Sequence, residues 1–289
     1  MINFLLVLGT QKCGTTWLSN QLKQHPQYQG CGIKEWRCIR DVVPACMKNR
    51  NYKPNISEIS EDYWYQLNHT DKRKFASSHL DNYFSVQKSA ITWGENADYL
   101  SLGDITGANG LTDSDSLAFF SHHAKSLGFN IKPLYILRDP VERHHSAVKM
   151  KFNNEYLVST DSIFNEQQHS ELFRKFTENS LHKEYFIGRT RYDLIIPKLE
   201  NVYGQGNILY CFAEDLKKEK SIDVVTDYLG LKRFDDETMD GYPEVISNQS
   251  SINFSINENM KQHIHNHYLE TYAFVNRFFG DLVPASWRN

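Results

Sequence analysis

The feature that most constrains the fold is a short apolar run that ends in a glycine-containing turn and then becomes helical. Residues 4–8 (FLLVL) are typical of a strand that is buried on both faces. Gly9 interrupts this run, and apolar side chains then recur at helical spacing, at Trp17, Leu18 and Leu22. A turn of this kind directs backbone N–H groups and the positive end of a helix dipole toward an anion. The segment therefore predicts a phosphate-binding loop, and the alternative is an ordinary glycine turn between a strand and a helix.

The position of one lysine distinguishes two kinds of phosphate loop. Loops that bind nucleoside triphosphates follow the pattern G-x-x-x-x-G-K-[ST]. Gly9 and Gly14 have that four-residue gap, but Thr15 occupies the place of the lysine. The lysine lies inside the loop instead, as Lys12. The pattern therefore argues against a P-loop nucleotide kinase or NTPase, which stays as the competing class.

A second informative segment begins with a predicted strand at residues 131–137. Arg138 follows it, Asp139 and Pro140 suit the start of a helix, and Ser146 lies eight residues after Arg138. A guanidinium at the end of a strand suits bidentate binding of a phosphate, and a nearby hydroxyl can add a donor. The alternative is that Arg138 pairs with Asp139 or caps a helix. An NTPase would end such a strand with an acid, and this strand ends with a base.

Strand-like and helix-like segments alternate along all 289 residues, which predicts one domain (1–289) of class α/β. We expect a P-loop-like fold of three layers, with a central parallel sheet and helices on both faces. Further strands are expected at 28–31, 90–93, 131–137 and 207–212. Helices are expected at 116–127, 141–152, 161–203 (with boundaries at Gly188 and Pro197) and 257–279. A further helix is expected to follow residues 213–216 and to end near Gly230, and short helices are expected within 38–88, where they wall the acceptor side. Residues 103–115 and 235–257 are expected to be loops, the second able to cover a ligand, and residues 72–74 (KRK) are expected to be exposed.

Charge and cysteine content exclude several classes of protein. The net charge of −3 provides no overall basic field for binding nucleic acid. The five cysteines are odd in number and scattered, which favours reduced thiols over a disulfide framework, and they lack the spacing of zinc sites. No apolar stretch approaches the roughly 20 residues that span a bilayer, and no signal peptide is visible. We therefore expect a cytoplasmic protein that binds neither nucleic acid nor membrane.

Histidine pairs do not predict a metal site. His144 and His145 are adjacent, and His263, His265 and His267 alternate in a segment expected to be helical. Neighbouring positions on a helix point to different faces, so solvated or partly buried histidines are the simpler interpretation. We expect no metal.

Taken together, the two motifs make the chain resemble the sulfotransferases that use 3′-phosphoadenosine 5′-phosphosulfate (PAPS), over nearly its whole length. Residues 12–16 (KCGTT) after a strand resemble the loop that holds the 5′-phosphosulfate in that family, and Arg138 with Ser146 matches its 3′-phosphate site. Further similarities lie at 188–192 (GRTRY), 207–216 (NILYCFAEDL), 277–280 (RFFG) and Trp287. Residues 34–36 (KEW) and 93–95 (WGE) are closer to the heparan-sulfate type than to the small-molecule hepatic type.

The resemblance implies a reaction and a set of residues. It implies transfer of a sulfuryl group from PAPS to a hydroxyl or amine, with release of 3′-phosphoadenosine 5′-phosphate (PAP). Lys12 would stabilise the leaving phosphate, and Glu35 would be the general base, unless Glu35 is a solvated carboxylate paired with Lys34 or Arg37. Glu95 is a further acid for the acceptor side, with a turn-capping role as its alternative. The implied cofactor-binding residues are Gln11, Lys12, Cys13, Gly14, Thr15, Thr16, Trp17, Arg138, Ser146 and Tyr192.

Departures from the heparan-sulfate type leave the acceptor open. Those enzymes follow the acid at the position of Glu95 with a lysine, where this chain has Asn96. Their late cofactor loop is rich in Gly and Lys, whereas residues 244–257 contain no Lys or Arg. They also follow a membrane anchor, which we do not expect here. The expected acceptor is a small molecule or a saccharide, with a peptide also open. An inactive nucleotide-binding module is a third class, against which the presence of Lys12 and Glu35 argues.

Overall fold

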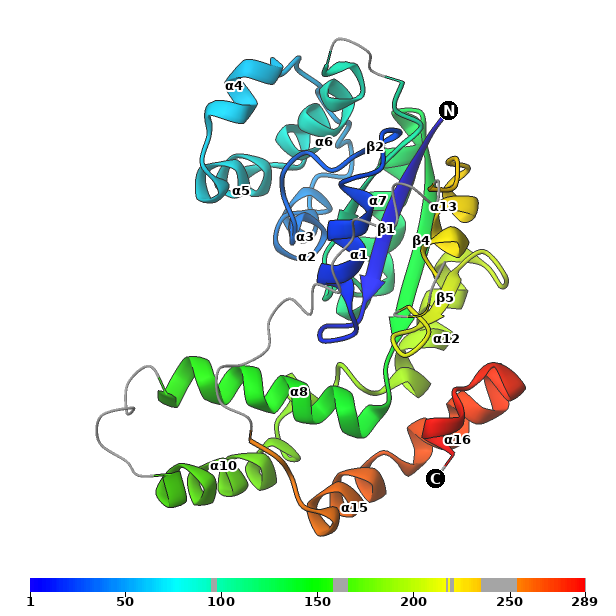
Figure 1. Ribbon diagram of the computed structural model, residues 1–289. Helices are drawn as coiled ribbons and strands as arrows, with labels where there is room; N and C mark the ends of the chain where they lie inside the picture. Colours follow the sequence, from blue (N-terminus) through cyan, green and yellow to red (C-terminus); the bar gives the residue numbers. More distant parts are fainter. Residues whose placement is uncertain (95–97, 158–165, 217, 219–220, 235–253, 289) are drawn as a thin grey trace.

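A five-stranded sheet forms the centre of the protein. The computed structural model describes residues 1–94, 98–157, 166–216, 218, 221–234 and 254–288. Neighbouring strands are parallel, in the order β2-β3-β1-β4-β5. The strands are β1 (Ile2–Gly9), β2 (Tyr28–Gln29), β3 (Ser101–Ile105), β4 (Phe129–Leu137) and β5 (Leu209–Phe212). β1 and β4 lie side by side in the middle of the sheet (Figure 1).

Helices connect the strands and cover the sheet, so the predicted α/β class is confirmed. In chain order they are α1 (Thr15–Leu22), α2 (Cys38–Asp41), α3 (Val43–Cys46), α4 (Glu61–Gln66), α5 (His69–Ser78), α6 (Leu80–Ser89), α7 (Ser114–Ser126), α8 (Pro140–Phe152), α10 (Glu166–Ser180), α11 (Glu184–Ile187), α12 (Tyr192–Tyr203), α13 (Ile222–Leu229), α15 (Glu258–His267) and α16 (Leu269–Phe279). Short helical turns are η1 (Ala90–Thr92), η2 (Asn109–Leu111), η3 (Asn153–Leu157), η4 (Gly280–Leu282) and η5 (Ala285–Trp287). None of these described helices has the length and apolar character needed to span a membrane.

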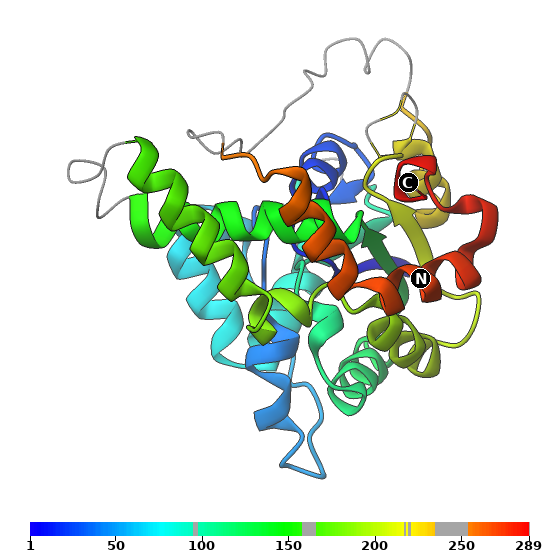
Figure 2. The ribbon, with the colours of Figure 1, turned by 90° about the horizontal axis from the view of Figure 1, so that it is seen from below.

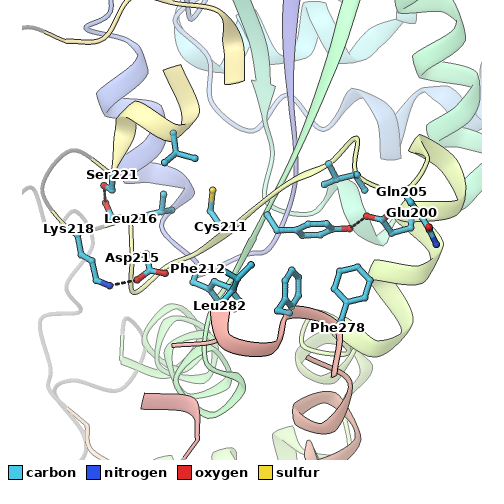
Figure 3. Close-up of a pocket in the computed structure, with 15 residues that line it drawn as sticks. Glu200, Gln205, Cys211, Phe212, Asp215, Leu216, Lys218, Ser221, Phe278 and Leu282 are labelled. Atoms are coloured by element: carbon cyan, nitrogen blue, oxygen red, sulfur yellow. Dashed lines mark hydrogen bonds and ion pairs between the residues drawn. The ribbon is translucent and has the colours of Figure 1, made fainter. Parts of the chain in front are cut away.

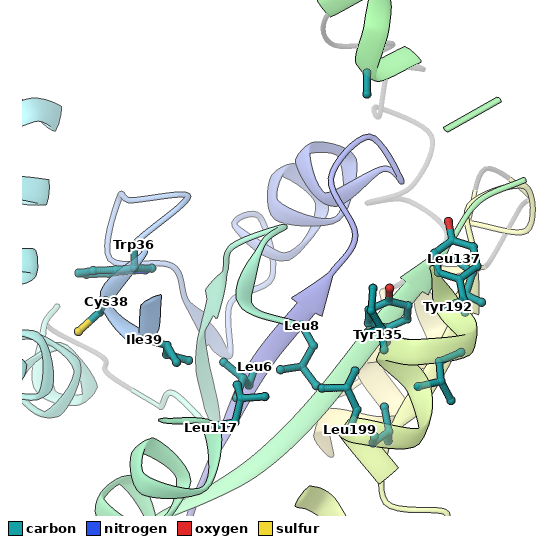
Figure 4. Close-up of a cluster of buried hydrophobic side chains, with 14 of the residues drawn as sticks. Leu6, Leu8, Trp36, Cys38, Ile39, Leu117, Tyr135, Leu137, Tyr192 and Leu199 are labelled. Atoms are coloured by element: carbon teal, nitrogen blue, oxygen red, sulfur yellow. The ribbon is translucent and has the colours of Figure 1, made fainter. Parts of the chain in front are cut away.

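Side chains that alternate along β1 divide the interior into two apolar cores. Leu5 and Val7 lie in one core with apolar residues of α1 and α13. Leu6 and Leu8 lie in the other, where Leu117 of α7 and residues of α12 pack against them (Figure 4). Because successive side chains of a strand point to opposite faces, the continuous apolar run of β1 requires helices on both sides of the sheet.

A group of helices lies beyond the C-terminal ends of the central strands. α8 leaves β4 at this edge and runs across it, and α10 and α15 lie against α8 (Figures 1 and 2). Pro140 occupies the first turn of α8, and the side chain of Asp139 accepts a hydrogen bond from the N–H of Glu142, as the sequence predicts for a capped helix. In open parallel sheets, ligands bind at this edge.

One predicted strand is wrong. Residues 90–93 do not join the sheet, because Ala90–Thr92 forms η1. The remaining strand is β3, which overlaps the loop predicted at 103–115. Its sequence, SLGDI, contains Gly and Asp, which are both depleted in strands. It is nevertheless buried throughout, because it pairs with β1 on one side and β2 on the other. Pairing with two partners thus overrides the weak local signal.

Two helix boundaries also differ from the predictions. Pro197 lies inside α12 rather than at its end, and the fully buried Ile196 and Leu199 hold the helix in place around it. The single helix predicted at 257–279 is two helices, α15 and α16, which meet at Tyr268. The hydroxyl of Tyr268 is hydrogen-bonded to His144 of α8 at 2.7 Å, so the residue at which the two helices meet also contacts α8.

The basic cluster at residues 72–74 is not fully exposed, contrary to prediction. Lys72 is buried, and its ammonium lies 4.8 Å from the ring centroid of Tyr65 and 5.5 Å from that of Trp64. An aromatic face can replace part of the hydration that a buried cation loses. The loop predicted at 235–257 lies mostly outside the described residues, as do residues 161–165 of the predicted helical segment.

The close approach of β3 to β1 gives a testable prediction about stability. A Cβ atom added at Gly103 would lie 2.4 Å from the carbonyl oxygen of Leu5. We expect Gly103→Ala to lower the free energy of unfolding by about 1–3 kcal/mol, the usual cost of overpacking. Urea denaturation would measure this loss, with Ser101→Ala on the same strand as a control that removes an atom instead of adding one. Equal stability of Gly103→Ala and the unmodified protein would contradict the prediction.

Candidate functional site

The parallel pairing of β1 and β4 brings the two predicted phosphate-binding segments together. Val7 is paired with Leu134, and Gly9 with Tyr135, so both strands end at the same edge of the sheet. The turn after β1 contains Lys12, and Arg138 follows β4. The guanidinium of Arg138 donates a hydrogen bond from Nη1 to the carbonyl oxygen of Lys12 at 3.0 Å. Two segments far apart in the sequence therefore contact each other directly.

Arg138 is held by its main chain as well as by its side chain. The hydroxyl of Tyr192 accepts a hydrogen bond from the N–H of Arg138 (3.3 Å) and donates one to its carbonyl oxygen (2.8 Å). The next residue, Asp139, donates its N–H to a carboxylate oxygen of Glu214 at 3.0 Å. Tyr192 is fully buried, so it contributes to this site by positioning Arg138. The arginine can therefore present its remaining N–H groups in a fixed direction.

The turn after β1 leaves backbone N–H groups in the first turn of α1 free to bind an anion. Gly14 is the residue before α1 and has a φ of 90°, a conformation that glycine adopts without strain. No side chain caps this helix end, so the N–H groups of Thr15, Thr16 and Trp17 have no partner within the helix. Such a helix end is suited to binding a phosphate.

Lys12 lies among other cations. Its own φ is 74°, and its side chain is half-buried, with no hydrogen bond from its ammonium to another described residue. Burial lowers the pKa of Lys12, and the positive charges of Arg138 and Lys34 lower it further. Burial and the neighbouring positive charges both disfavour the charged form of Lys12 in the free protein. A bound anion would offset the repulsion from those charges.

Other predicted residues of the loop have different environments. Cys13 is fully buried, and burial raises the pKa of its thiol to about 12, so it can offer only its backbone to a ligand. The amide oxygen of Gln11 is buried without a partner among the described residues. The hydroxyl of Thr16 accepts a hydrogen bond from Lys34. Ser146 lies in α8, half-buried, and no hydrogen bond or ion pair joins it to Arg138.

A cavity of about 270 Å³ lies between the two segments. It is lined by Lys12, Cys13, Gly14, Trp17, Arg138, Glu142, Ala213, Glu214 and Leu216. The two glutamates were not predicted as site residues. The second carboxylate oxygen of Glu214 is buried and has no partner among the described residues, so it can accept a hydrogen bond from a ligand hydroxyl or amino group. The signal in the sequence was its position directly after a strand, in residues 213–216 (AEDL).

A larger cavity of about 990 Å³ lies elsewhere, beside the edge strand β5 (Figure 3). Its walls are mainly apolar and include Phe212, Phe278 and Leu282. It contains none of the predicted site residues, and it shares only Leu216 with the smaller cavity. Size alone therefore does not identify the functional site, and the cations and the open helix end favour the smaller cavity.

Glu35 lies in a tightly held turn between β2 and α2. Glu35 and Arg37 have φ values of 65° and 59°, which non-glycine residues rarely adopt. Between them, Trp36 is buried and stacks on Trp64 with ring centroids 6.1 Å apart. The turn is tied to the end of β3, because the N–H of Glu35 donates to the carbonyl of Ile105 at 3.3 Å. The strained conformation is thus fixed from both sides.

The carboxylate of Glu35 contacts both its own loop and the loop after β3. One of its oxygens accepts a hydrogen bond from the N–H of Gly107 at 3.4 Å. The same oxygen lies 3.6 Å from the ammonium of Lys34, which also donates to the hydroxyl of Thr16 at 2.8 Å. The ion pair with Lys34 that the sequence offered as an alternative is therefore present, and it links Glu35 to the first turn of α1. Glu95 lies outside the described residues.

A buried acid that the sequence reasoning missed supports this turn. Asp104 of β3 is fully buried and accepts hydrogen bonds from Thr106 (2.5 Å), Tyr83 (3.3 Å) and Asn109 (3.4 Å). The hydroxyl of Thr106 in turn accepts the N–H of Arg37 at 3.3 Å. Burial raises the pKa of Asp104 to about 7. The sequence signal for this residue was an acid within a strand, and it was missed because residues 103–115 were predicted to be a loop.

His144 has structural partners. His144 is fully buried and is hydrogen-bonded to Tyr268 and Ser180, both at 2.7 Å, and burial lowers its pKa to about 3. It is therefore a neutral part of the packing between helices. In the part of the chain that the structure describes, no group of three or more His, Cys, Asp or Glu side chains is arranged to hold a metal ion.

Comparisons with known proteins agree with this architecture. The family model described as "Sulfotransferase domain" matches residues 3–277. A sulfotransferase from Alicyclobacillus acidocaldarius is similar over 100% of both chains, with a TM-score of 0.58 and 14% identity. A sulfotransferase domain from the curacin biosynthetic pathway covers 93% of this chain and 98% of its own, with a TM-score of 0.49 and 14% identity. At this identity, the first likeness shows a shared fold. No curated protein sequence matches the chain.

The raised pKa of Asp104 predicts an unusual pH dependence of stability. An unfolded aspartic acid loses its proton near pH 4, whereas Asp104 in the folded protein keeps it to about pH 7. Between these values the folded state binds more protons, so its stability falls as the pH rises. From pH 5 to pH 8, the free energy of unfolding should fall by about 2–3 kcal/mol more in the unmodified protein than in Asp104→Asn.

Chemical denaturation at several pH values would measure this difference. Asp113→Asn is a matched control, because a hydrogen bond from the backbone of Ser116 lowers the pKa of Asp113, so this residue stays ionised over the same range. Parallel pH profiles for the unmodified protein and Asp104→Asn would show that Asp104 is ionised in the folded state.

Proposed function

The chain belongs to the sulfotransferase domain family, and from this membership we propose that it transfers a sulfuryl group from PAPS to a hydroxyl or amine of an acceptor and releases PAP. The contact between Lys12 and Arg138 at the open end of α1 is the observation that carries the proposal. PAPS has a phosphosulfate at one end and a 3′-phosphate at the other, and it supplies both the sulfuryl group and the leaving group. Two cationic groups from neighbouring strand ends fit the charges of such a molecule.

The residues around the smaller cavity also fit a nucleotide with two charged ends. In this proposal the N–H groups of the first turn of α1 bind the 5′-phosphate, together with the side chains of Thr15 and Thr16. Arg138 binds the 3′-phosphate, and Ser146 is proposed to add its hydroxyl to that site. Trp17 and Glu214 line the cavity, and the unpartnered oxygen of Glu214 is available to a ribose hydroxyl or to the base. Gln11 does not line this cavity, and its proposed part in cofactor binding rests on its place in the loop. Tyr192 contributes by holding Arg138.

Lys12 and Glu35 have separate roles in the proposed reaction. Sulfuryl transfer resembles phosphoryl transfer, in which positioning and stabilisation of charge supply most of the catalysis. The ammonium of Lys12 stabilises the negative charge that grows on the leaving phosphate. Glu35 accepts the proton of the attacking hydroxyl or amine, and its hydrogen bond from Gly107 holds one oxygen in place while the other can face the acceptor.

Two other classes fit the observations less well. A P-loop kinase or NTPase needs a lysine after Gly14 and an acid at the end of a strand such as β4, where this chain has Thr15 and Arg138. An inactive nucleotide-binding module would not need Glu35 in a strained turn beside the loop. The acceptor is proposed to be a small molecule or a saccharide, and the resemblance to the heparan-sulfate type stays a hypothesis, as do the cytoplasmic location and the single domain.

Binding of PAP tests the proposed function. At a PAP concentration 100 times the Kd, the free energy of unfolding should rise by about 2.7 kcal/mol. Thermal melting and calorimetry would measure the stabilisation and the affinity. ATP with and without Mg²⁺ is the comparison ligand. Stronger stabilisation by ATP with Mg²⁺ than by PAP would support a kinase or NTPase and contradict the proposal.

Replacement of Arg138 tests the orientation of the nucleotide. Arg138→Ala should weaken PAP binding by about 1.5–3 kcal/mol, the usual contribution of a hydrogen bond to a charged group. AMP lacks the 3′-phosphate, so its affinity should change far less. Calorimetric titration of both ligands would measure the two losses. The exposed Arg233, which pairs with Asp227 and does not line the cavity, provides the control variant Arg233→Ala. Equal losses for PAP and AMP would mean that Arg138 acts through the fold.

A further inference from the structure

We propose that Lys34 is a second catalytic cation, whose ammonium binds the sulfuryl group during transfer while Glu35 accepts the proton of the acceptor. This inference rests on the proposed function. It assigns to Lys34 a role that differs from the role of Lys12. Lys12 acts on the leaving phosphate, and Lys34 acts on the oxygens of the group that moves.

The first support is the position of the ammonium. Lys34 lies in the loop after β2, on the other side of β3 and β1 from Arg138. Its side chain nevertheless reaches the first turn of α1, where Nζ donates to the hydroxyl of Thr16 at 2.8 Å. That hydroxyl lies at the helix end that is open to an anion. The ammonium therefore lies beside the helix end at which the phosphosulfate is proposed to bind.

The second support is the partner on the opposite side. The same Nζ atom lies 3.6 Å from Oε1 of Glu35. An ammonium has three N–H donors, and this one makes one hydrogen bond and one longer ion pair, so it has donor capacity left for a ligand. The side chain of Lys34 is 22% exposed, which allows a ligand to reach it. Lys34 thus stands between the residue proposed to hold the donor and the residue proposed to activate the acceptor.

The third support is the balance of charge. Burial lowers the pKa of Lys34, and the neighbouring carboxylate of Glu35 opposes this effect. The charge of Lys34 also contributes to the lowered pKa of Lys12, so the two ammonium groups lie close enough to repel. A sulfuryl group between them carries negative oxygens that would relieve this repulsion. In the free protein, Thr16 and Glu35 take the place of those oxygens.

The proposed step is balanced in atoms and charge. The acceptor oxygen or nitrogen forms a bond to sulfur, the bond between sulfur and the bridging phosphate oxygen breaks, and PAP leaves with that electron pair. The proton of the acceptor passes to Glu35. Lys34 stays protonated throughout and contributes by hydrogen bonds and charge that strengthen in the transition state.

A purely structural role for Lys34 would change PAP and PAPS binding in a different way. If its only task is to tie the loop to α1, its loss would disturb PAP and PAPS binding equally. If it binds the sulfuryl group, its loss would affect PAPS and spare PAP, because PAP lacks that group. Lys34→Met keeps most of the side-chain volume and removes the charge. Lys34→Arg keeps the charge, and Lys34→Gln replaces Lys34→Met should that variant fail to fold.

The experiment measures binding of PAP and PAPS by calorimetry and the slow release of PAP from PAPS in the absence of an acceptor, when water is the nucleophile. We expect Lys34→Met to weaken PAPS binding by about 10-fold to 100-fold, and PAP binding by less than about 3-fold. Hydrolysis at saturating PAPS should fall by about 10-fold or more, with partial recovery in Lys34→Arg. Lys23→Met is the matched control, since Lys23 is exposed, adds to the positive charge near Lys34 and contacts neither Thr16 nor Glu35.

The outcomes separate the inference from the proposed function. Equal losses for PAP and PAPS, or unchanged PAPS binding and hydrolysis in a folded Lys34→Met, would overturn the role of Lys34 and leave the proposed function standing. An unmodified protein that binds neither PAP nor PAPS would overturn both. A similar loss in Lys23→Met would show that the effect is one of general charge, and it would also overturn the inference.

Discussion

The parallel pairing of β1 with β4 is the constraint on which the rest of the site depends. Its register makes both strands end at the same edge, where the carbonyl of Lys12 accepts a hydrogen bond from Arg138. A shift of the register by one residue would exchange the side chains of β1 between the two cores, and each core is packed around its own set, so the packing opposes such a shift. The site is therefore stabilised by the same packing that stabilises the fold. Tyr192 adds to this stabilisation, because its buried hydroxyl forms hydrogen bonds with the main chain of Arg138.

The turn that contains Glu35 and the end of β3 form the other half of the candidate site. The turn that contains Glu35 has a strained backbone, and it is held by Trp36 in the aromatic core and by hydrogen bonds to the end of β3. Such conformations persist only where the surrounding structure fixes them. Asp104 and Thr106 provide this support from inside the sheet. The two halves of the site meet through Lys34, which precedes Glu35 in this turn and donates a hydrogen bond to Thr16 of α1.

Three cations of the candidate site lie near one another, and only part of their charge is offset by neighbouring carboxylates. Lys12, Lys34 and Arg138 converge at a helix end that is itself positive, and the pKa of Lys12 falls through burial and repulsion. Glu35 and Glu142 offset part of this charge through ion pairs with Lys34 and Arg138. A polyanion would remove the remaining repulsion, so binding and stability should be strongly coupled. Functional sites commonly keep such unfavourable charge because their ligand supplies the missing partner.

The sequence by itself determined the features whose causes are local. An apolar run, a glycine and a helical repeat define β1, its turn and α1, and Asp139 with Pro140 defines the start of α8, because each signal acts within a few residues. Only the tertiary structure decided the features that depend on distant partners. β3 forms despite a poor strand sequence because two strands pair with it, and α15 and α16 meet at Tyr268, whose hydroxyl is hydrogen-bonded to His144 of α8. The site follows the same division. The sequence indicates Lys12, Arg138 and Glu35 as candidates, but their distances, and the links through Tyr192 and Lys34, arise from contacts between elements that local patterns do not encode.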